Sequence, residues 1–327
     1  MRIVLCYPAE AKHIQQIQAV APDAEVVDAG QEHIAEEILS ADIYCGHAKV
    51  PVPWGEVVRQ GRLKWIQSSA AGLDHCLVPE VIDSEIPVTS ASGVLADQVT
   101  EQTLALLTGF LRSMPVFYRA QQAHEFIRRP TRDLHHTTIG IVGLGGVGRR
   151  LAEVLSVFKT RILATDWDPY DKPSYVEELW PADRLHDLCR AVDILILCAP
   201  LNKHTRGMIN AEAFAQMKSG ALLCNVARGP LVVEADLVAA LESGHLSGAV
   251  MDVTEKEPLP TDSKLWDMPN VIITPHVGGQ SKRRLDNGTD FFCENLRRYL
   301  AGEPLKNLVD KQLGFPRRRP TGGEEPR

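Results

Sequence analysis

Short apolar runs alternate with helix-like segments through the first hundred of the chain's 327 residues. The runs are about three residues long, mostly apolar or β-branched, and the polar stretches between them contain helical patterns such as residues 31–39. Strands that alternate with helices in this way predict βαβ units and a parallel sheet. The predicted strands of this first region are residues 3–5, 25–27, 43–45, 65–67 and 87–89.

The same alternation resumes in the second half of the chain. Between the two regions, residues 98–113 have the pattern of a strongly apolar helix, and residues 114–136 that of a partly irregular arm. In the second region, helices such as 211–217 and 234–243 fill the gaps between apolar runs, which predicts a second parallel sheet. Its predicted strands are residues 138–142, 161–165, 193–198, 221–225, 247–251 and 271–274.

One turn in this second region carries a glycine pattern. Gly143, Gly145 and Gly148 follow the first of these strands in the spacing G-x-G-x-x-G, and a helical pattern comes directly after them. This order is typical of dinucleotide-binding folds, where the glycines permit a tight turn, approach of the pyrophosphate and close packing of the helix. The helix N-terminus then faces the anion. The residues predicted to bind the dinucleotide are Gly143, Gly145, Gly146, Val147 and Gly148.

An acidic residue follows the next strand. Asp166 lies roughly 20 residues beyond the glycines, where dinucleotide-binding folds place the acid that binds the ribose hydroxyls. A carboxylate there also repels a 2′-phosphate, which favours NAD over NADP. Taken alone, Asp166 reads equally well as a turn residue before Trp167. Together with the glycine turn, it indicates cofactor binding.

Composition narrows the classes of partner. The net charge of −7 offers no basic surface for nucleic acid or an anionic membrane. No stretch reaches the length of about 18 apolar residues that a membrane span needs, and the N-terminal apolar run is too short for a secretion signal. The seven cysteines are scattered, which indicates core residues of a cytoplasmic protein. His124-Glu125 lacks the second histidine of a zinc motif, so no metal is assigned.

Polar residues follow three predicted strands of the second region. Arg228, Glu257 and His276 come shortly after its fourth, fifth and sixth strands. The carboxyl ends of parallel strands form the ligand edge of such sheets. Taken singly, each residue reads as an ordinary turn or capping residue. In the first region, residues 68–74 form a small-residue turn at the same kind of edge, either an ordinary tight turn or a site where backbone N–H groups meet a ligand.

Several separated motifs make a family resemblance specific. The chain resembles the D-isomer-specific 2-hydroxyacid dehydrogenase family over nearly its whole length except the tail. The motifs that carry this resemblance, besides the glycine turn and residues 68–74, are Val99-Thr100-Glu101, Ala199-Pro200-Leu201-Asn202, Asn225-Val226-Ala227-Arg228-Gly229, Gly248-Ala249-Val250-Met251-Asp252-Val253, Glu257-Pro258 and Thr274-Pro275-His276.

The resemblance implies a role for each polar residue. Arg228 would bind the substrate's carboxylate and carbonyl oxygen, because a planar guanidinium can meet a carboxylate with two hydrogen bonds. His276 would be the general acid that protonates the keto oxygen, and Glu257 would hold its imidazole and favour the protonated form. The further contacts that the resemblance implies are Ala199, Pro200 and Asp252 to the cofactor, and the backbone of Ala71, Gly72 and Leu73 to the substrate.

The resemblance also implies an architecture. We expect an α/β protein of two doubly wound parallel-sheet domains, with a Rossmann NAD-binding domain inserted into a flavodoxin-like substrate domain. The substrate domain would comprise residues 1–97 and be completed by residues 286–315, including an amphipathic helix at 291–300. The NAD-binding domain would comprise residues 98–285, and residues 316–327 would form a disordered tail.

The expected activity is hydride transfer between NAD and a small 2-keto or D-2-hydroxy acid, such as hydroxypyruvate or glyoxylate. The alternative is an NAD(H)-sensing co-regulator of the same fold without significant turnover. A phosphate-bearing substrate such as 3-phosphoglycerate is disfavoured, because residues 68–75 contain no arginine or lysine. The resemblance further implies a homodimer through the helix and arm of residues 98–136. His47, Lys49 and Trp54 could shape a substrate pocket, but we expect surface residues.

Overall fold

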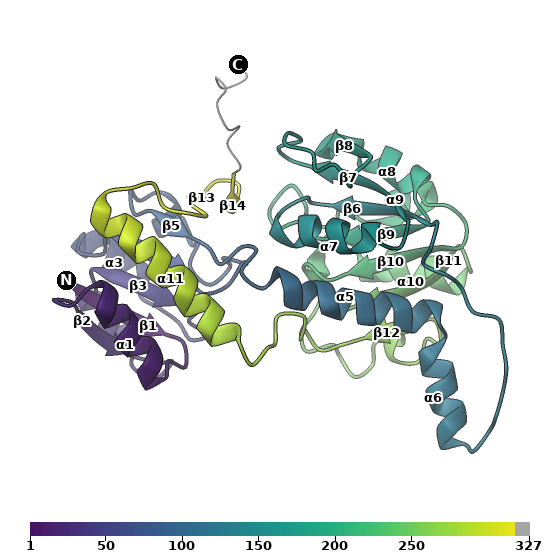
Figure 1. The fold of residues 1–327 in the computed structure, drawn as a ribbon, viewed down its shortest axis with the longest axis horizontal. Coiled ribbons are helices and arrows are strands. Elements are labelled where there is room, and N and C mark those ends of the chain that lie inside the picture. The colour runs from purple at the N-terminus through teal and green to yellow at the C-terminus, as the bar shows by residue number, and fades with distance from the viewer. Residues whose placement is uncertain (318–327) are drawn as a thin grey trace. The chain divides into compact units, whose positions relative to one another are not determined.

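The structure is a computed structural model that describes residues 1–317. The chain divides into two compact units (Figure 1). The first contains Met1–Leu95 and the segment that begins at Ser281, and the second contains Ala96–Gln280. Most of the predicted disordered tail, residues 318–327, lies outside the described residues. Pro316, which the tail was predicted to include, instead belongs to a short strand described below.

The first unit is built on a five-stranded parallel sheet of order β2-β1-β3-β4-β5. This is the flavodoxin-like order. One face carries α1 and α11, which lie side by side in Figure 1, and the other carries α2, α3 and α4. An antiparallel pair, β13 with β14, follows α11. The bounds are β1 Arg2–Cys6, α1 Ala11–Val20, β2 Glu25–Asp28, α2 Ile34–Glu37, β3 Ile43–Gly46, α3 Trp54–Gln60, β4 Trp65–Ser68, α4 Pro79–Ile82, β5 Val88–Thr89, α11 Arg284–Ala301, β13 Val309–Asp310 and β14 Phe315–Pro316.

The second unit is built on a seven-stranded parallel sheet of order β12-β11-β10-β9-β6-β7-β8. Counted from β6, the order is 3-2-1-4-5-6 with one further strand, which is the Rossmann order. Helices α5 and α7 pack on one face, and α8, α9 and α10 on the other. The bounds are α5 Ala96–Leu111, α6 Met114–Gln122, β6 Thr138–Val142, α7 Gly146–Ser156, β7 Arg161–Asp166, β8 Glu178–Pro181, α8 Leu185–Ala191, β9 Ile194–Leu197, α9 Ala211–Gln216, β10 Ala221–Asn225, α10 Glu234–Glu242, β11 Leu246–Met251 and β12 Val271–Ile273.

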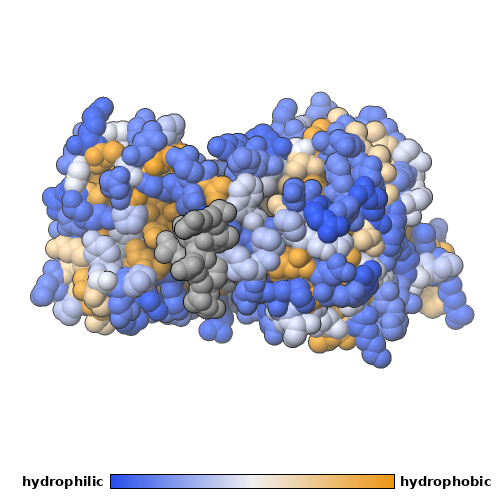
Figure 2. Space-filling model, turned by 90° about the horizontal axis from the view of Figure 1, so that it is seen from above, coloured by the Kyte–Doolittle hydropathy of each residue, from blue (hydrophilic) through white to orange (hydrophobic). Residues whose placement is uncertain are grey.

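Each sheet is apolar on both faces because helices cover both. Along β9, Ile194 and Ile196 pack with α5 and α7, whereas Leu195 and Leu197 pack with α8 and α9. Successive strand residues point to opposite faces, so a fully covered strand must be apolar at every position. Hydrophilic side chains cover most of the face of the molecule drawn in Figure 2. The predicted α/β class with two doubly wound sheets is confirmed.

Some predicted elements were wrong in number or extent. The second sheet has seven strands instead of six, because β8 was missed. Only two apolar residues separate Glu178 from Pro181, and this edge strand is partly exposed along its length. The helix predicted at 31–39 is one turn of α2 followed by a 3-10 turn to Ser40. Helix α11 begins at Arg284, seven residues before the predicted start at 291.

Within residues 1–317, no helix is both long enough and apolar enough to cross a membrane. The described part of the chain also holds no group of three or more histidine, cysteine, aspartate or glutamate side chains that could hold a metal ion.

Candidate active site

Three neighbouring strands supply the three residues with candidate chemistry. Arg228 follows β10, Glu257 follows β11 and His276 follows β12. These strands are adjacent and parallel, so their carboxyl ends lie at one edge of the sheet. Neighbouring strands lie about 5 Å apart. The fold therefore brings the three positions to the same stretch of the ligand edge.

His276 and Glu257 form a hydrogen-bonded pair. The Nδ1 atom of His276 lies 2.8 Å from Oε2 of Glu257, and the other carboxylate oxygen accepts a hydrogen bond from the Thr254 backbone N–H at 3.3 Å. An ionised carboxylate can only accept, so Nδ1 carries the proton of this bond. The His276 side chain is 47% exposed. Its Nε2 atom is thus the ring nitrogen left to act on a bound molecule.

A hydrogen-bonded turn presents Arg228. The buried Asn225 side chain donates to the Arg228 carbonyl at 3.0 Å and accepts from the Ala227 N–H at 3.1 Å. The guanidinium donates to the Ala227 carbonyl at 2.7 Å. A β-carbon at Gly229 would lie 1.7 Å from the Thr254 carbonyl oxygen, so only glycine lets this turn pack against the chain after β11.

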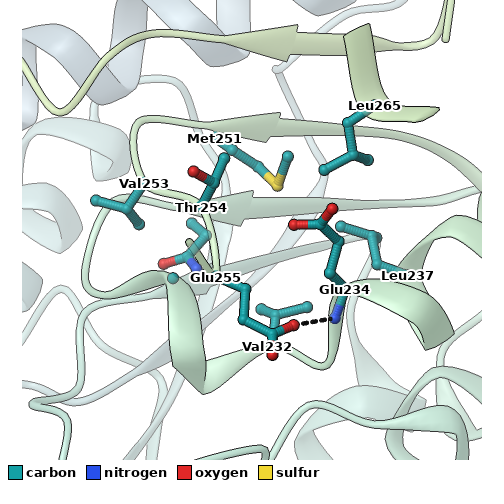
Figure 3. Close-up of a pocket in the computed structure, with 10 residues that line it drawn as sticks. Val232, Glu234, Leu237, Met251, Val253, Thr254, Glu255 and Leu265 are labelled. Carbon is teal, nitrogen blue, oxygen red and sulfur yellow. Dashed lines mark hydrogen bonds between the residues drawn. The ribbon is translucent and has the colours of Figure 1, made fainter. Parts of the chain in front are cut away.

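Behind this turn lies a small apolar cavity, drawn in Figure 3. Val232, Leu237, Met251 and Leu265 are among its lining residues, and the Glu234 N–H donates to the Glu255 carboxylate beside it at 2.9 Å. Its volume of about 10 Å³ is at the lower limit for a single water molecule. The cavity is therefore a packing gap and holds no substrate.

Asp252 lies at the base of the loop that carries His276. It is 2% exposed, and its carboxylate accepts hydrogen bonds from the backbone N–H groups of Val277 at 3.0 Å and Gly278 at 2.7 Å. The His276 N–H donates to the Asp252 carbonyl at 2.7 Å. The residue that the resemblance assigned to the cofactor therefore also organises the loop next to it.

The glycine turn has the geometry that a dinucleotide requires. Gly143 has a φ of 93°, and a β-carbon on it would lie 2.8 Å from the Ala199 backbone. A β-carbon at Gly148 would lie 2.1 Å from the Gly143 carbonyl oxygen. Gly145, the N-cap of α7, is exposed and would meet nothing within 4 Å. The protein's own packing does not demand glycine at 145, whereas a phosphate lying against the backbone would.

Asp166 lies at the end of β7 and binds the same turn. Its Oδ2 accepts from the Leu144 N–H at 2.6 Å, and its Oδ1 accepts from the Asp168 N–H at 3.0 Å. Burial is the largest influence and raises the pKa of this carboxyl, against those two hydrogen bonds. Ala199 and Pro200 follow β9, the neighbour of β6, so they lie beside the glycine turn at the same edge. These residues fit a dinucleotide.

In the first unit, the small-residue turn follows β4. The Ser68 hydroxyl exchanges hydrogen bonds with Ala70, and the Ala91 N–H donates to the Ala70 carbonyl at 3.0 Å. Within residues 1–317, the backbone N–H groups of Ala71, Gly72 and Leu73 donate to no protein acceptor. Consecutive unused N–H groups are suited to bind an anion.

The residues expected to be ordinary surface positions near this turn are not all exposed. Trp54 is 4% exposed, packs edge-on against Tyr44 and donates from its indole to the His75 carbonyl at 3.2 Å. His47 is half-buried and stacks on the His75 ring with centroids 4.1 Å apart. Lys49 is exposed. The expectation for Trp54 was therefore wrong, because its ring fills the core beneath α3.

Sequence reasoning assigned no supporting role to the residues that hold the site in place. Asn225 fixes the Arg228 turn, Gly229 lets it pack, and Gly278 lets the His276 loop meet Asp252, since a β-carbon there would lie 2.8 Å from the Asp252 Oδ2. The signal for Asn225 was available, because a polar residue at the last position of a buried strand needs a partner.

Comparison with known proteins decides the family. The model of the D-isomer specific 2-hydroxyacid dehydrogenase, NAD binding domain, matches residues 104–278. The chain belongs to the D-isomer-specific 2-hydroxyacid dehydrogenase family. The members of this family that it resembles are NAD(P)-dependent oxidoreductases of 2-hydroxy acids, and the predicted family and enzyme class are confirmed.

Two relatives are about one-third identical to the chain over the residues that match. It is 34% identical to the glyoxylate reductase of Thermofilum pendens, over 77% of the chain and 76% of that protein. It is 30% identical to the hydroxypyruvate reductase of Blautia hydrogenotrophica, over 86% of the chain and 88% of that protein. It spans only 59% of the length of the D-3-phosphoglycerate dehydrogenase of Methanocaldococcus jannaschii, with 28% identity.

A solved family member has the same fold. The D-isomer specific 2-hydroxyacid dehydrogenase of Xanthobacter autotrophicus Py2, crystallised with NADPH and MES, matches with a TM-score of 0.82 and 30% identity. The match covers 96% of this chain and 99% of that one. Dinucleotide binding at this fold is therefore established for a relative, with NADPH as the ligand.

Proposed function

We propose that this enzyme transfers hydride between NAD and a small 2-keto or D-2-hydroxy acid, with His276 as the general acid and base. The observation that carries the proposal is the 2.8 Å hydrogen bond between Nδ1 of His276 and Glu257, at the edge to which β10 also brings Arg228. A histidine oriented by a carboxylate, beside an arginine, is the arrangement that carbonyl reduction needs.

Each residue has a defined task in this scheme. The nicotinamide, when bound, supplies the hydride in reduction and accepts it in oxidation. Arg228 binds the carboxylate and keto oxygen of the substrate and fixes the plane of the keto group. Nε2 of His276 donates its proton to the keto oxygen as the carbon is reduced, and Glu257 stabilises the imidazolium and keeps Nε2 pointed outward. In the oxidation direction, Nε2 takes that proton back.

We propose NAD as the preferred cofactor. The carboxylate of Asp166, at the end of β7, accepts the ribose hydroxyls and repels a 2′-phosphate. The other proposed contacts to the cofactor are Gly143, Gly145, Gly146, Val147, Gly148, Ala199, Pro200 and Asp252. The solved relative from Xanthobacter autotrophicus Py2 contains NADPH, so the choice between the two cofactors has to be measured for this chain.

We propose that the backbone N–H groups of Ala71, Gly72 and Leu73 bind the substrate's carboxylate. Their lack of protein acceptors within residues 1–317 supports this role. The first domain (1–97 with 286–315) would thus contribute these N–H groups to substrate binding, and the second (98–285) would bind the cofactor and supply Arg228 and His276. The names of the relatives favour glyoxylate or hydroxypyruvate as the substrate class.

We propose a homodimer formed through residues 98–136. Large apolar side chains are exposed along this segment: Met114 is 56% exposed, Tyr118 61% and Phe126 94%. Exposed apolar clusters of this kind mark protein contacts. Light scattering that gives the monomer mass would contradict the dimer.

We also propose a cytoplasmic location. The seven cysteines are free and all but Cys198 are buried, which fits a reducing cytoplasm.

The test of the function is NADH consumption with a panel of 2-keto acids that includes glyoxylate, hydroxypyruvate, pyruvate and phenylpyruvate, with NADPH in parallel. We expect turnover of at least one small 2-keto acid with NADH. Tight NADH binding without any turnover would contradict the proposal and favour the alternative of an NAD(H)-sensing co-regulator. Faster turnover with NADPH would overturn only the assignment of Asp166 and would leave the proposed reaction in place.

A further inference from the structure

The backbone at His276 adopts a conformation that its side chain disfavours. Its φ is 54°, in the left-handed region, where a residue with a β-carbon is sterically strained. Such a conformation persists only where the surrounding structure fixes it. If the strain were released, Nδ1 would move away from Glu257, so whatever holds this loop also holds the proposed acid.

Asp252 makes three hydrogen bonds to the loop. Its backbone carbonyl accepts from His276, and its two carboxylate oxygens accept from the next two N–H groups, those of Val277 and Gly278. These bonds require one orientation of the carboxylate. Since Asp252 is 2% exposed, water cannot supply the remaining partners freely, and other side chains must fix that orientation.

Two side chains outside the proposed chemistry do so. The Thr274 hydroxyl donates to Oδ1 of Asp252 at 2.6 Å, and the Gln102 amide donates to that hydroxyl at 3.0 Å. Gln102 lies on α5, which packs against β11. A chain of hydrogen bonds therefore runs from α5 through Thr274 and Asp252 to the loop. The first hydrogen bond sets the direction of the second: the Thr274 hydroxyl accepts from the Gln102 amide, so its own hydrogen is left to donate to Asp252.

We propose that Gln102 and Thr274 are positioning residues that hold the His276 imidazole in its productive orientation by fixing the carboxylate of Asp252. The proposal rests on the proposed role of His276. Neither side chain contacts substrate in this scheme. Their effect is transmitted through the backbone N–H groups of Val277 and Gly278.

Each test variant removes or keeps one of these hydrogen bonds. Thr274→Val keeps the shape and removes the hydroxyl, whereas Thr274→Ser keeps the hydroxyl. Gln102→Met keeps the length of the side chain and removes its amide. Thr108→Ala is the matched control, because the Thr108 hydroxyl also makes a hydrogen bond from α5, but to the Leu104 carbonyl of the same helix.

The first measurement is amide hydrogen exchange of the whole chain without cofactor, followed at the peptide that contains residues 274–280. We expect exchange at Val277 and Gly278 to become at least tenfold faster in Thr274→Val and severalfold faster in Gln102→Met. Thr274→Ser and Thr108→Ala should leave it near the wild-type rate. This measurement does not depend on catalysis.

The second measurement is steady-state reduction of a 2-keto acid by NADH. Hydrogen bonds of this kind predict a fall in kcat of about 10- to 100-fold for Thr274→Val and about 3- to 10-fold for Gln102→Met. Thr274→Ser should restore most of the kcat. A purely structural role would lower the melting temperature of Thr108→Ala and of Gln102→Met alike and leave kcat unchanged.

Faster exchange together with lower kcat supports the proposal. Unchanged exchange, or faster exchange with unchanged kcat, overturns it. If the wild-type enzyme reduces no 2-keto acid, the proposed function fails by itself, and the exchange rates alone then decide whether Gln102 and Thr274 hold the loop.

Discussion

The Nδ1 atom of His276 lies 2.8 Å from Oε2 of Glu257, although 19 residues separate the two in the chain. Adjacent parallel strands bring them together, since β11 leads to Glu257 and β12 to His276. The pair leaves Nε2 of the histidine available, and this single relationship carries the proposed acid–base chemistry.

Substitution of Arg228 by lysine should nearly abolish activity. Lysine keeps the charge but lacks the planar fork that binds a carboxylate with two hydrogen bonds. We expect kcat/KM for the 2-keto acid to fall by about 100-fold or more, with NADH affinity little changed. Arg190→Lys is the matched control, because Arg190 is a surface arginine that pairs with Asp187. Equal activities of the two variants would remove Arg228 from the site.

Substitution of Asp166 by asparagine should relax cofactor choice. Asparagine can still accept from the Leu144 N–H, which Asp166 binds at 2.6 Å, so the glycine turn keeps its anchor while the charge is lost. We expect NADH to bind about 10-fold more weakly and the preference for NADH over NADPH to shrink, with kcat at saturating NADH retained. Dissociation constants for both cofactors, from nicotinamide fluorescence, test this. A lower kcat with unchanged affinities would contradict the assigned role.

Two glycines of the same turn should respond in opposite ways to alanine. At Gly145 a β-carbon meets nothing within 4 Å, whereas at Gly148 it would lie 2.1 Å from the Gly143 carbonyl oxygen. Gly145→Ala should therefore fold normally and lose NADH affinity, because the methyl group stands where the phosphate approaches. Gly148→Ala should lower the melting temperature. Calorimetry and NADH titration separate the two effects, and normal NADH affinity in a folded Gly145→Ala would argue against cofactor binding at this turn.

The stability of the first unit should decline in acid because of His75. Burial first, and the neighbouring His47 ring second, lower the pKa of His75 from 6.5 to about 3, against the smaller, opposite influence of the Gly46 backbone. The unfolded chain thus binds a proton at His75 below pH 6.5 that the folded chain does not bind until about pH 3. The neutral His75 ring therefore makes its full contribution to the free energy of unfolding above pH 6.5, and this contribution is lost as the pH falls towards 3.

The matched variant for this effect is His75→Phe, which keeps an aromatic ring and removes the titration. The free energy of unfolding is measured with urea at pH 7.5 and pH 4.5, on either side of 6.5. Between these two pH values it should fall by about 2 kcal/mol more in the wild-type protein than in the variant. Identical pH dependence in the two proteins would mean that His75 is not held neutral by the fold.

The sequence predicted the sheets well because their strands are buried on both faces. Runs such as Ile194–Leu197 are apolar at every position, which a covered parallel strand requires. Strand β8 was not predicted because it is an edge strand with only two apolar residues between Glu178 and Pro181. The early start of α11 was not predicted because its first two turns are mostly polar. Side-chain hydrogen bonds hold them, such as those between Asp286 and His13 at 2.8 Å and between Thr289 and Tyr7 at 3.1 Å.

The candidate site was predicted where residue type and strand end coincide, as at Arg228 and His276. The supporting residues could not be predicted in the same way. Gln102 looks like any polar position on an amphipathic helix, and its hydrogen bond to Thr274 spans 172 residues of sequence. Trp54 was misjudged because its burial depends on Tyr44 and His75, which the local pattern around it does not reveal.

The most direct test of the account is the rate of hydride transfer in His276→Gln, measured in a single turnover with NADH and the best 2-keto acid. His186→Gln is the matched control, since His186 also lies near a glutamate, with Nδ1 3.7 Å from Glu212, but belongs to α8 and is not one of the proposed site residues. Loss of a general acid predicts a rate about 100- to 10,000-fold below wild type, with the NADH dissociation constant unchanged. A His276→Gln enzyme as fast as the wild type and the control would remove His276 from the mechanism.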